Sequence, residues 1–186
     1  MSQERASMQL DLSHLGRRAR GDEHVDRTFE ASDFHTSDED GYRIAAPAHL
    51  VMDVQKDRDA FRVTGRVATT LELECGRCLE RFQVPVNSPF ELRYVSVAHN
   101  AGDGEREIGE DDLSTTYYKD DALDVEDLMR EQFQLALPMK PLCSETCQGL
   151  CPECGTNLNT AACSCAPKWE DPRLGALKGL LGEKKE

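Results

Sequence analysis

Apolar and polar residues alternate through the middle of the chain, between Tyr42 and Val97. Three polar stretches, KDRDA, GRC and NSP, separate the alternating runs. A period of two is typical of strands with one buried face, so this region predicts an antiparallel β-meander or a partly open barrel. The alternating apolar positions are Leu50, Met52 and Val54; Phe61, Val63 and Val67; Leu71 and Leu73; Phe82, Val84 and Val86; and Phe90, Leu92 and Tyr94.

Two further features complete the predicted sheet. Residues 7–12 (SMQLDL) alternate weakly and predict an opening strand. Gly65 lies within an alternating run, where a glycine indicates a bulge or a bend.

The apolar period changes to 3.6 after residue 123 and predicts one main helix over about 124–137. Asp124 is a suitable N-cap, Asp127 adds acid to the first turn, and Pro138 ends the helix. The fold class is therefore α+β, with the sheet packed by one main helix. The apolar stripe contains Val125, Leu128, Met129, Phe133, Ala136 and Leu137, interrupted by Gln132.

Polar and glycine-rich segments flank these elements. Residues 98–116 are acidic, without an apolar period, and predict a mobile loop, with ordering on binding as the alternative. Arg17, Arg18 and Arg20 predict a solvated basic turn. Residues 171–181 predict a short amphipathic helix that begins at Pro172. We expect residues 1–142 to form a β-rich domain with that acidic loop and the main helix. We expect residues 143–186 to form a cysteine-rich, metal-binding module that is similar to a zinc ribbon and includes the short C-terminal helix.

The eight cysteines occur in two places, and their spacing is the strongest chemical signal in the chain. Two lie in C-G-R-C, and six lie in the 23 residues 143–165. The N-terminus lacks the basic-then-apolar layout of a secretory signal, so we expect a cytoplasmic protein, whose thiols stay reduced and favour metal over disulfides. The candidate ligands are Cys75, Cys78, Cys143, Cys147, Cys151, Cys154, Cys163 and Cys165.

Zinc is the metal that such cysteines favour, because a structural site needs four ligands and C-x-x-C supplies two of them from one tight turn. The pair in C-P-E-C-G is best completed by Cys163 and Cys165. Cys143 and Cys147 are then left for Cys75 and Cys78. We expect two zinc ions per chain, with one ion as the alternative, and the grouping of the ligands is open to other partitions.

Other uses of the cysteines are less well supported. Cys147, Cys151 and Cys154 have the C-x-x-x-C-x-x-C spacing of radical SAM enzymes, but only 32 residues follow Cys154. A thioredoxin-like pair at Cys75 and Cys78 needs a helix, whereas a strand pattern follows. The sequence shows no catalytic constellation, and we expect no enzyme. The histidines lack ligand spacing; they are His14, His24, His35, His49 and His99.

The net charge of −13 limits the partners. Residues 101–131 carry twelve acidic side chains against three basic ones, while residues 41–100 are nearly neutral. A chain without a basic footprint does not bind nucleic acid non-specifically, so any RNA contact is local or passes through a basic protein. No run approaches the ~18 apolar residues of a membrane span.

The residues around the cysteines resemble the bacterial and plastid YceD family of large ribosomal RNA subunit accumulation proteins. The resemblance rests on C-x-R-C, a helix ending in L-A-L-P, P-L-C-S-E-x-C-x-G-L-C-P-x-C-G-x-N-L-N, a C-x-C and D-P-R-L-x-x-L, and it covers about Leu71 to Leu181. It implies a non-enzymatic factor in large-subunit biogenesis or ribosomal RNA accumulation. Some family members look as if they keep only the C-x-x-C and pair that match Cys75, Cys78, Cys143 and Cys147.

The family resemblance and the acidic charge together point to a protein partner. We expect ribosomal proteins or assembly factors of the large subunit to bind the acidic segment 101–131, with little direct RNA contact, no membrane and no small-molecule substrate. The alternative is a redox- or metal-responsive regulator whose cysteines release zinc on oxidation.

Overall fold

The computed structural model describes residues 8–16, 21–37, 40–97 and 115–165. It divides the chain into two compact units. The first, the sheet unit, contains Met1–Glu74 and Arg81–Pro141; the second, the cysteine unit, contains Cys75–Glu80 and Leu142–Glu186. The predicted basic turn at Arg17–Arg20, residues 98–114 of the predicted acidic loop and the predicted C-terminal helix lie outside the described residues.

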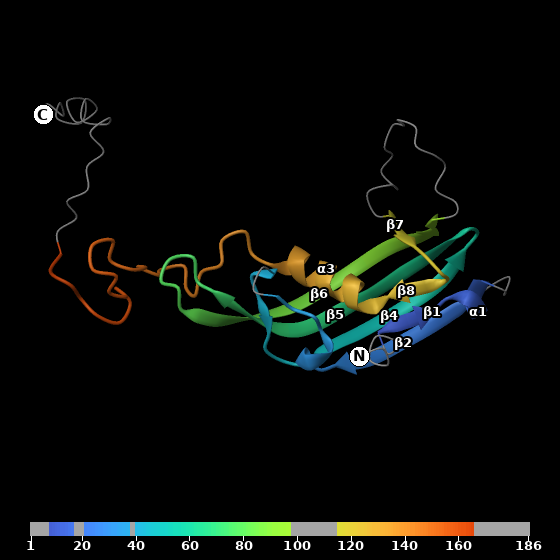
Figure 1. Ribbon diagram of the computed structural model, residues 1–186, viewed down its shortest axis with the longest axis horizontal. Coiled ribbons are helices and arrows are strands. Elements are labelled where there is room, and N and C mark those ends of the chain that lie inside the picture. Colours follow the sequence, from blue (N-terminus) through green and yellow to red (C-terminus); the bar gives the residue numbers. More distant parts are fainter. Residues whose placement is uncertain (1–7, 17–20, 38–39, 98–114, 166–186) are drawn as a thin grey trace, which may run out of the picture. The chain divides into compact units, whose positions relative to one another are not determined.

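A curled sheet forms the body of the sheet unit, with one main helix against it (Figure 1). The predicted α+β class is confirmed. The strand order is β2-β4-β5-β6-β7, and β3 pairs with β5. The strands between Tyr42 and Val97 pair antiparallel, as predicted for that region. Strand β7 lies beyond it and pairs parallel with β6. The strands are β2 (Asp22–Phe29), β3 (Arg43–Ile44), β4 (Ala48–Asp57), β5 (Ala60–Glu74), β6 (Arg81–Ser96) and β7 (Thr115–Tyr118).

The two longest strands, β5 and β6, pair without interruption from Ala60↔Val95 to Glu74↔Arg81. The break expected at N-S-P is therefore wrong. Pro89 is tolerated because β7 pairs only with the last four residues of β6, so the strand is an edge at that proline. The GRC break is confirmed and forms the turn at the end of this hairpin.

Gly65 continues the ladder on both sides and forms no bulge, which corrects the bulge expected there. A Cβ atom at this position would lie 2.5 Å from the Val51 carbonyl oxygen and 2.8 Å from Cζ of Phe90. The missing side chain therefore lets the Phe90 ring pack directly over β5.

The predicted helix is confirmed as α3 (Val125–Ala136), which lies across the sheet (Figure 1). The Asp124 carboxylate accepts a hydrogen bond from the Asp127 backbone N–H, so it caps the helix as predicted. Gln132 is buried with the apolar stripe, and its Oε1 accepts from the Ser88 hydroxyl at 3.5 Å. None of the helices in the described part of the chain is long and apolar enough to cross a bilayer.

A second, small sheet joins the beginning of the chain to the start of α3. It pairs β1 (Gln9–Asp11) with β8 (Ala122–Asp124) in antiparallel register. The opening strand is confirmed, whereas β2, β7 and β8 were not predicted. Strand β7 begins at Thr115, so the loop predicted over 98–116 is wrong in its last two residues. A short helix α1 (Ser13–Gly16) and a 3-10 turn (Ala31–Asp33) follow β1 and β2. The core between these elements centres on Phe133, whose ring lies 5.7 Å from that of Phe34 and 6.1 Å from that of Tyr42.

Candidate metal centres

Two turns of the cysteine unit have the same backbone hydrogen bonds. In the first turn, the Cys75 N–H donates to the Glu80 carbonyl and the Leu79 N–H donates to the Cys75 carbonyl, both at 2.9 Å. In the second, the Cys151 N–H donates to the Thr156 carbonyl at 2.8 Å and the Gly155 N–H to the Cys151 carbonyl at 2.9 Å.

Each turn therefore holds one C-x-x-C pair, and the residue after the second cysteine has a positive φ. This angle is 62° at Leu79 and 72° at Gly155. Glycine adopts this conformation freely, whereas leucine is strained in it. Leu79 therefore occupies the position in the first turn that glycine fills in the second.

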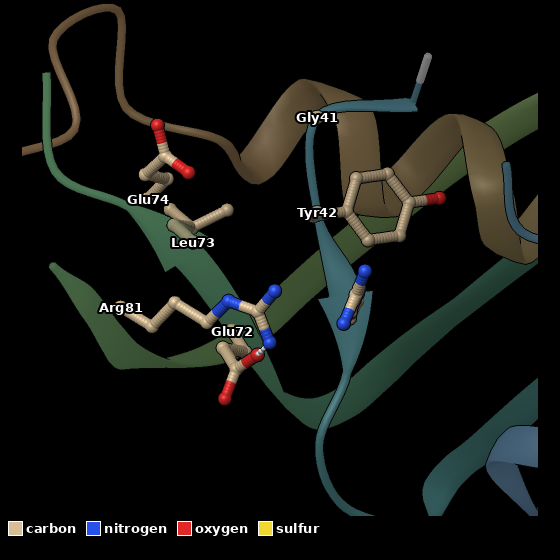
Figure 2. Close-up of a pocket in the computed structure, with 7 residues that line it drawn as sticks. Gly41, Tyr42, Glu72, Leu73, Glu74 and Arg81 are labelled. Carbon is tan, nitrogen blue, oxygen red and sulfur yellow. Dashed lines mark hydrogen bonds and ion pairs between the residues drawn. The ribbon is translucent and has the colours of Figure 1, made fainter. Parts of the chain in front are cut away.

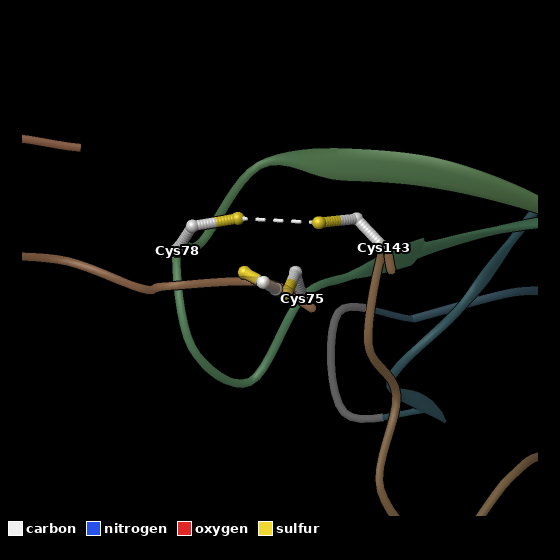
Figure 3. A group of neighbouring side chains, drawn as sticks. Cys75, Cys78 and Cys143 are labelled. Atoms are coloured by element: carbon white, nitrogen blue, oxygen red, sulfur yellow. Dashed lines mark hydrogen bonds between the residues drawn. The ribbon is translucent and has the colours of Figure 1, made fainter. Parts of the chain in front are cut away.

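Site 1 is the group of Cys75, Cys78, Cys143 and Cys147, whose sulfur atoms all lie within 4.8 Å of one another. The Sγ atoms of Cys75 and Cys147 are 3.8 Å apart, and those of Cys78 and Cys143 are 3.6 Å apart (Figure 3). Four sulfurs around a zinc ion at ~2.3 Å lie about 3.8 Å from one another in a regular tetrahedron. Three of the four cysteines are buried, and Cys143 is exposed.

Site 2 is the group of Cys151, Cys154, Cys163 and Cys165, whose sulfurs also lie within 4.8 Å of one another. Cys151 is buried and Cys163 is half-buried, while Cys154 and Cys165 are exposed. The structure thus brings the eight cysteines together in the two groups that the spacing favoured. That these groups bind metal remains a prediction.

Asn159 supports site 1 from outside the ligand set. Its side-chain amide donates to the Sγ atom of Cys147 at 3.3 Å, and its Oδ1 accepts from the Gln148 N–H at 2.8 Å. The Asn157 carboxamide oxygen accepts in turn from the Asn159 side chain at 2.8 Å, which fixes its orientation. A donor of this kind spreads the negative charge of a thiolate ligand.

Arg77, inside the first C-x-x-C turn, ties that turn to the segment around Cys147. Its guanidinium donates to the Cys147 carbonyl at 2.8 Å, and its own carbonyl accepts from the Leu150 N–H at 3.1 Å. Sequence reasoning did not assign a role to Arg77 or Asn159. The only signal in the sequence was that Arg77 belongs to the motif C-x-R-C and Asn159 to the motif N-L-N.

The thiols of each site differ widely in acidity. The backbone N–H of Cys78 is the main cause that lowers the pKa of Cys75 to about 6, and the Thr156 hydroxyl lowers the pKa of Cys154 to about 6. Hydrogen bonding to the Cys78 sulfur raises the pKa of Cys143 to about 12, and the Cys154 sulfur has the same effect on Cys165. Each cluster thus contains thiols that ionise readily beside thiols that resist ionisation; in site 1 the pKa of Cys147 is lowered as well as that of Cys75.

A divalent cation fits both donor sets. It would favour the thiolate forms of Cys143 and Cys165, whose pKa is raised mainly by hydrogen bonding to a neighbouring sulfur. Tetrahedral four-sulfur sites are typical of zinc or iron. The residues that would hold it are the four cysteines of each site.

The alternatives for the cysteines can be compared with this geometry. Cys147 lies in site 1 while Cys151 and Cys154 lie in site 2, so the C-x-x-x-C-x-x-C spacing does not hold one cluster. The residues after Cys78 form strand β6 and no helix, unlike a thioredoxin-like pair. Among the described residues no histidine belongs to either group.

A hollow of about 420 Å³ in the sheet unit is the other feature that could suggest a reaction site (Figure 2). Arg81 and Glu72 form an ion pair in it, with Nη1 3.3 Å from Oε1. The Tyr42 hydroxyl points away from this pair (Figure 2). The hollow therefore does not combine these groups into an acid–base set, and we assign no reaction to it.

The fold and the two cysteine groups together define the class of this protein. It is an α+β protein whose cysteine unit carries two four-thiol groups. The family model described as "Large ribosomal RNA subunit accumulation protein YceD" matches residues 63–181, more than half of the chain. The chain therefore belongs to the YceD family, as the sequence resemblance indicated.

Similar proteins come from plants and bacteria. The maize "Large ribosomal RNA subunit accumulation protein YCED homolog 1, chloroplastic" is 29% identical over 169 residues, covering 78% of this chain and 57% of the relative. An uncharacterized protein of Mycobacterium tuberculosis (strain ATCC 25618 / H37Rv) is 32% identical over 187 residues, covering 94% and 82%. YlbN of Bacillus subtilis is 28% identical over 137 residues, covering 72% and 73%.

The plant relatives are longer proteins than this chain. The Arabidopsis thaliana homolog of the same name is 26% identical over 166 residues, and the match covers 52% of it. The chain thus spans about half the length of the two plant relatives. No solved structure matches the chain.

Proposed function

We propose that the chain is a non-enzymatic, zinc-binding factor of large ribosomal subunit biogenesis that supports ribosomal RNA accumulation in the cytoplasm. The observation that carries the proposal is the pair of four-thiol groups in a YceD chain. Four thiolates complete a tetrahedral site, so no position stays open for a water or a substrate. Such metals would stabilise a fold rather than perform chemistry.

The cysteine residues have a structural role in this proposal. One zinc ion in each site would join the first C-x-x-C turn to Cys143 and Cys147, and the second to Cys163 and Cys165. The plant relatives are named for accumulation of the large ribosomal RNA subunit, and we extend that role to this chain.

The proposed partners are ribosomal proteins or assembly factors of the large subunit. The net charge of −13 becomes −17 when eight thiolates bind two divalent ions, which disfavours extended contact with RNA. We propose no membrane attachment and no small-molecule substrate.

The metal part of the proposal is tested by counting. Purified protein from zinc-supplemented cells should contain two zinc ions per chain by elemental analysis, and Cys75→Ser or Cys151→Ser should each reduce the count to one. Iron in place of zinc, or a wild-type count near one, would contradict the two-zinc assignment.

The cellular part is tested by removing the gene. The ratio of large-subunit to small-subunit ribosomal RNA should fall, and plasmid-borne wild type should restore it. The tagged protein, purified from growing cells, should retain ribosomal or assembly proteins after nuclease treatment. An unchanged ratio together with an eluate free of large-subunit components would refute the proposed role.

Site 2 gives a specific reason to keep the second function, a redox- or metal-responsive regulator. Cys154 and Cys165 are exposed, so an oxidant reaches them more easily than the buried thiols of site 1. Mild peroxide with a zinc-indicator dye distinguishes the two functions: a biogenesis factor should keep both ions, and a regulator should release at least the ion of site 2.

A further inference from the structure

A cleft of about 440 Å³ lies in the sheet unit and is lined by residues of β6, β7, β8 and α3, among others. Its lining includes four carboxylates and one basic side chain, Lys119. We call it the acidic cleft, after its carboxylates Asp120, Asp124, Asp127 and Glu131.

Two of the carboxylates are available for a ligand. Asp124 is already used as the N-cap of α3, whereas Asp127 and Glu131 follow it at helical spacing and lie on one face. Neither Asp127 nor Glu131 belongs to an ion pair among the described residues. Desolvation, with the Asp127 charge as the second cause, raises the pKa of Glu131. These negative charges therefore lack a cationic partner within the described chain.

Tyr94 adds a neutral polar group to the lining of the cleft. Its side chain lines the cleft and is only 5% exposed, yet its hydroxyl has no hydrogen-bond partner among the described residues. Burial raises the pKa of Tyr94, and the charge of Glu131 adds to it. This hydroxyl is not sealed from solvent as that of Tyr42 is, so it opens into the cleft, where an entering N–H donor would bond the hydroxyl and the carboxylates together.

The chemistry selects a cationic side chain as the ligand. The carboxylates do not form a group as tight as the cysteine clusters, so a bare metal ion is disfavoured. A phosphate backbone would be repelled by the net negative charge. The volume falls within the range of about 300–1,000 Å³ that encloses small ligands, which suits single side chains rather than a folded surface. Arginine presents five donors and stacks on tyrosine rings, such as that of Tyr118.

We propose that the acidic cleft binds arginine side chains of an extended basic segment in a protein partner. This inference rests on the proposed function, because it assigns the basic partner to a defined surface of the sheet unit. The segment enters between Tyr94 and the carboxylates of Asp127 and Glu131.

The test uses the full zinc-loaded chain and a fluorescein-labelled, amidated nonapeptide of alternating arginine and serine. Fluorescence anisotropy at 150 mM salt should show saturable binding, and a peptide with glutamate in place of arginine should not bind. The double variant Asp127→Asn/Glu131→Gln should weaken binding about tenfold, since each partly exposed ion pair contributes modestly. Tyr94→Phe should weaken it about threefold through one lost hydrogen bond.

A matched control removes the same charge elsewhere in the sheet unit. Asp57→Asn/Asp59→Asn changes two exposed carboxylates at the β4–β5 turn that do not line the cleft. This variant should change the affinity less than twofold. Equal weakening by both double variants would show a general charge effect and overturn the proposal. The proposal would also be overturned if a nine-nucleotide RNA bound specifically and the double variant Asp127→Asn/Glu131→Gln abolished that binding.

Complementation separates this proposal from the proposed function. In cells lacking the gene, Asp127→Asn/Glu131→Gln should keep both zinc ions and the circular dichroism spectrum of the wild type but fail to restore the ribosomal RNA ratio. Full restoration by this variant would overturn the cleft as a partner site while leaving the proposed function intact. If the peptide binds as expected but wild type does not affect the ratio, the proposed function fails and the cleft stands.

Discussion

Chelation of the metals should unfold the cysteine unit and leave the sheet unit folded. The reason is the distribution of buried side chains. Every buried side chain of the cysteine unit in its described part is a cysteine, and none of its residues belongs to the hydrophobic core. The sheet unit has its own core of leucine, valine, methionine and aromatic side chains, which does not depend on metal.

The extent of unfolding expected on chelation follows from this difference in buried side chains between the two units. Structural zinc contributes about 10–16 kcal/mol of apparent binding free energy per site in small zinc domains. A unit of this size without an apolar core does not fold without such a contribution. Removing both ions should therefore take the cysteine unit from almost fully folded to almost fully unfolded, rather than shift its stability slightly.

Hydrogen exchange read by mass spectrometry measures both units in one sample. After chelation under reducing conditions, amide protection should be lost at Leu79, Cys151 and Gly155, whose N–H groups close the two C-x-x-C turns. Amides of the β4–β5 ladder should stay protected, because the sheet unit stays folded even though loss of the site 1 cross-link lowers its stability. Re-added zinc should restore the protection of the turns. Persistent protection at the turns in a metal-free sample would refute the reasoning.

Three substitutions test individual contacts. Leu79→Gly should stabilise the cysteine unit by about 0.5 kcal/mol in denaturant titration, because relief of about 1–2 kcal/mol of left-handed strain exceeds the entropy cost of glycine; Leu79→Ala should give no gain. Gly65→Ala should destabilise the sheet unit by about 1–3 kcal/mol in thermal unfolding, since its Cβ would lie 2.7 Å from that of Met52. Asn159→Ala should weaken zinc binding at site 1 about 10- to 100-fold in chelator competition, because the amide donor to Cys147 is lost, and leave site 2 unchanged.

The sheet and helix were predictable where side chains alternate between a buried and an exposed face. Strand β4 alternates in this way, so its buried face follows from the sequence. Strand β2 was missed because only Val25 and Phe29 are buried along its eight residues, so an edge strand of this kind shows no period of two. Strand β8 has three residues and depends on pairing with β1, which no local pattern reveals.

The cysteine grouping was predictable for a different reason. A C-x-x-C turn fixes two ligands locally, so only the partner pair had to be chosen. The roles of Arg77 and Asn159 could not be predicted, because both side chains donate to atoms of Cys147 that only the folded chain brings close to them. Arg77 and Cys147 are 70 residues apart in the sequence. Leu79 could not be predicted for another reason. A glycine is expected after the second cysteine of such a turn, but this position holds a leucine with a strained, positive φ.

Site 1 also closes a long loop through the sheet unit, and this predicts that its loss affects the sheet as well. Cys78 and Cys143 are 65 residues apart, and β6 and α3 lie between them in the chain. While site 1 stays intact, unfolding of the sheet unit releases a closed loop with fewer conformations than a free chain. Loop-closure entropy for this length corresponds to about 4 kcal/mol.

Cys78→Ser should therefore lower the unfolding free energy of the sheet unit by up to about 4 kcal/mol. Cys151→Ser is the matched control, because site 2 spans only residues 151–165 and encloses no part of the sheet. Denaturant unfolding of both variants, followed by hydrogen exchange of the β5–β6 amides, compares the effect of losing site 1 on the sheet with the effect of losing site 2. If Cys78→Ser destabilises the sheet unit no more than Cys151→Ser does, site 1 does not act as a cross-link that stabilises the sheet.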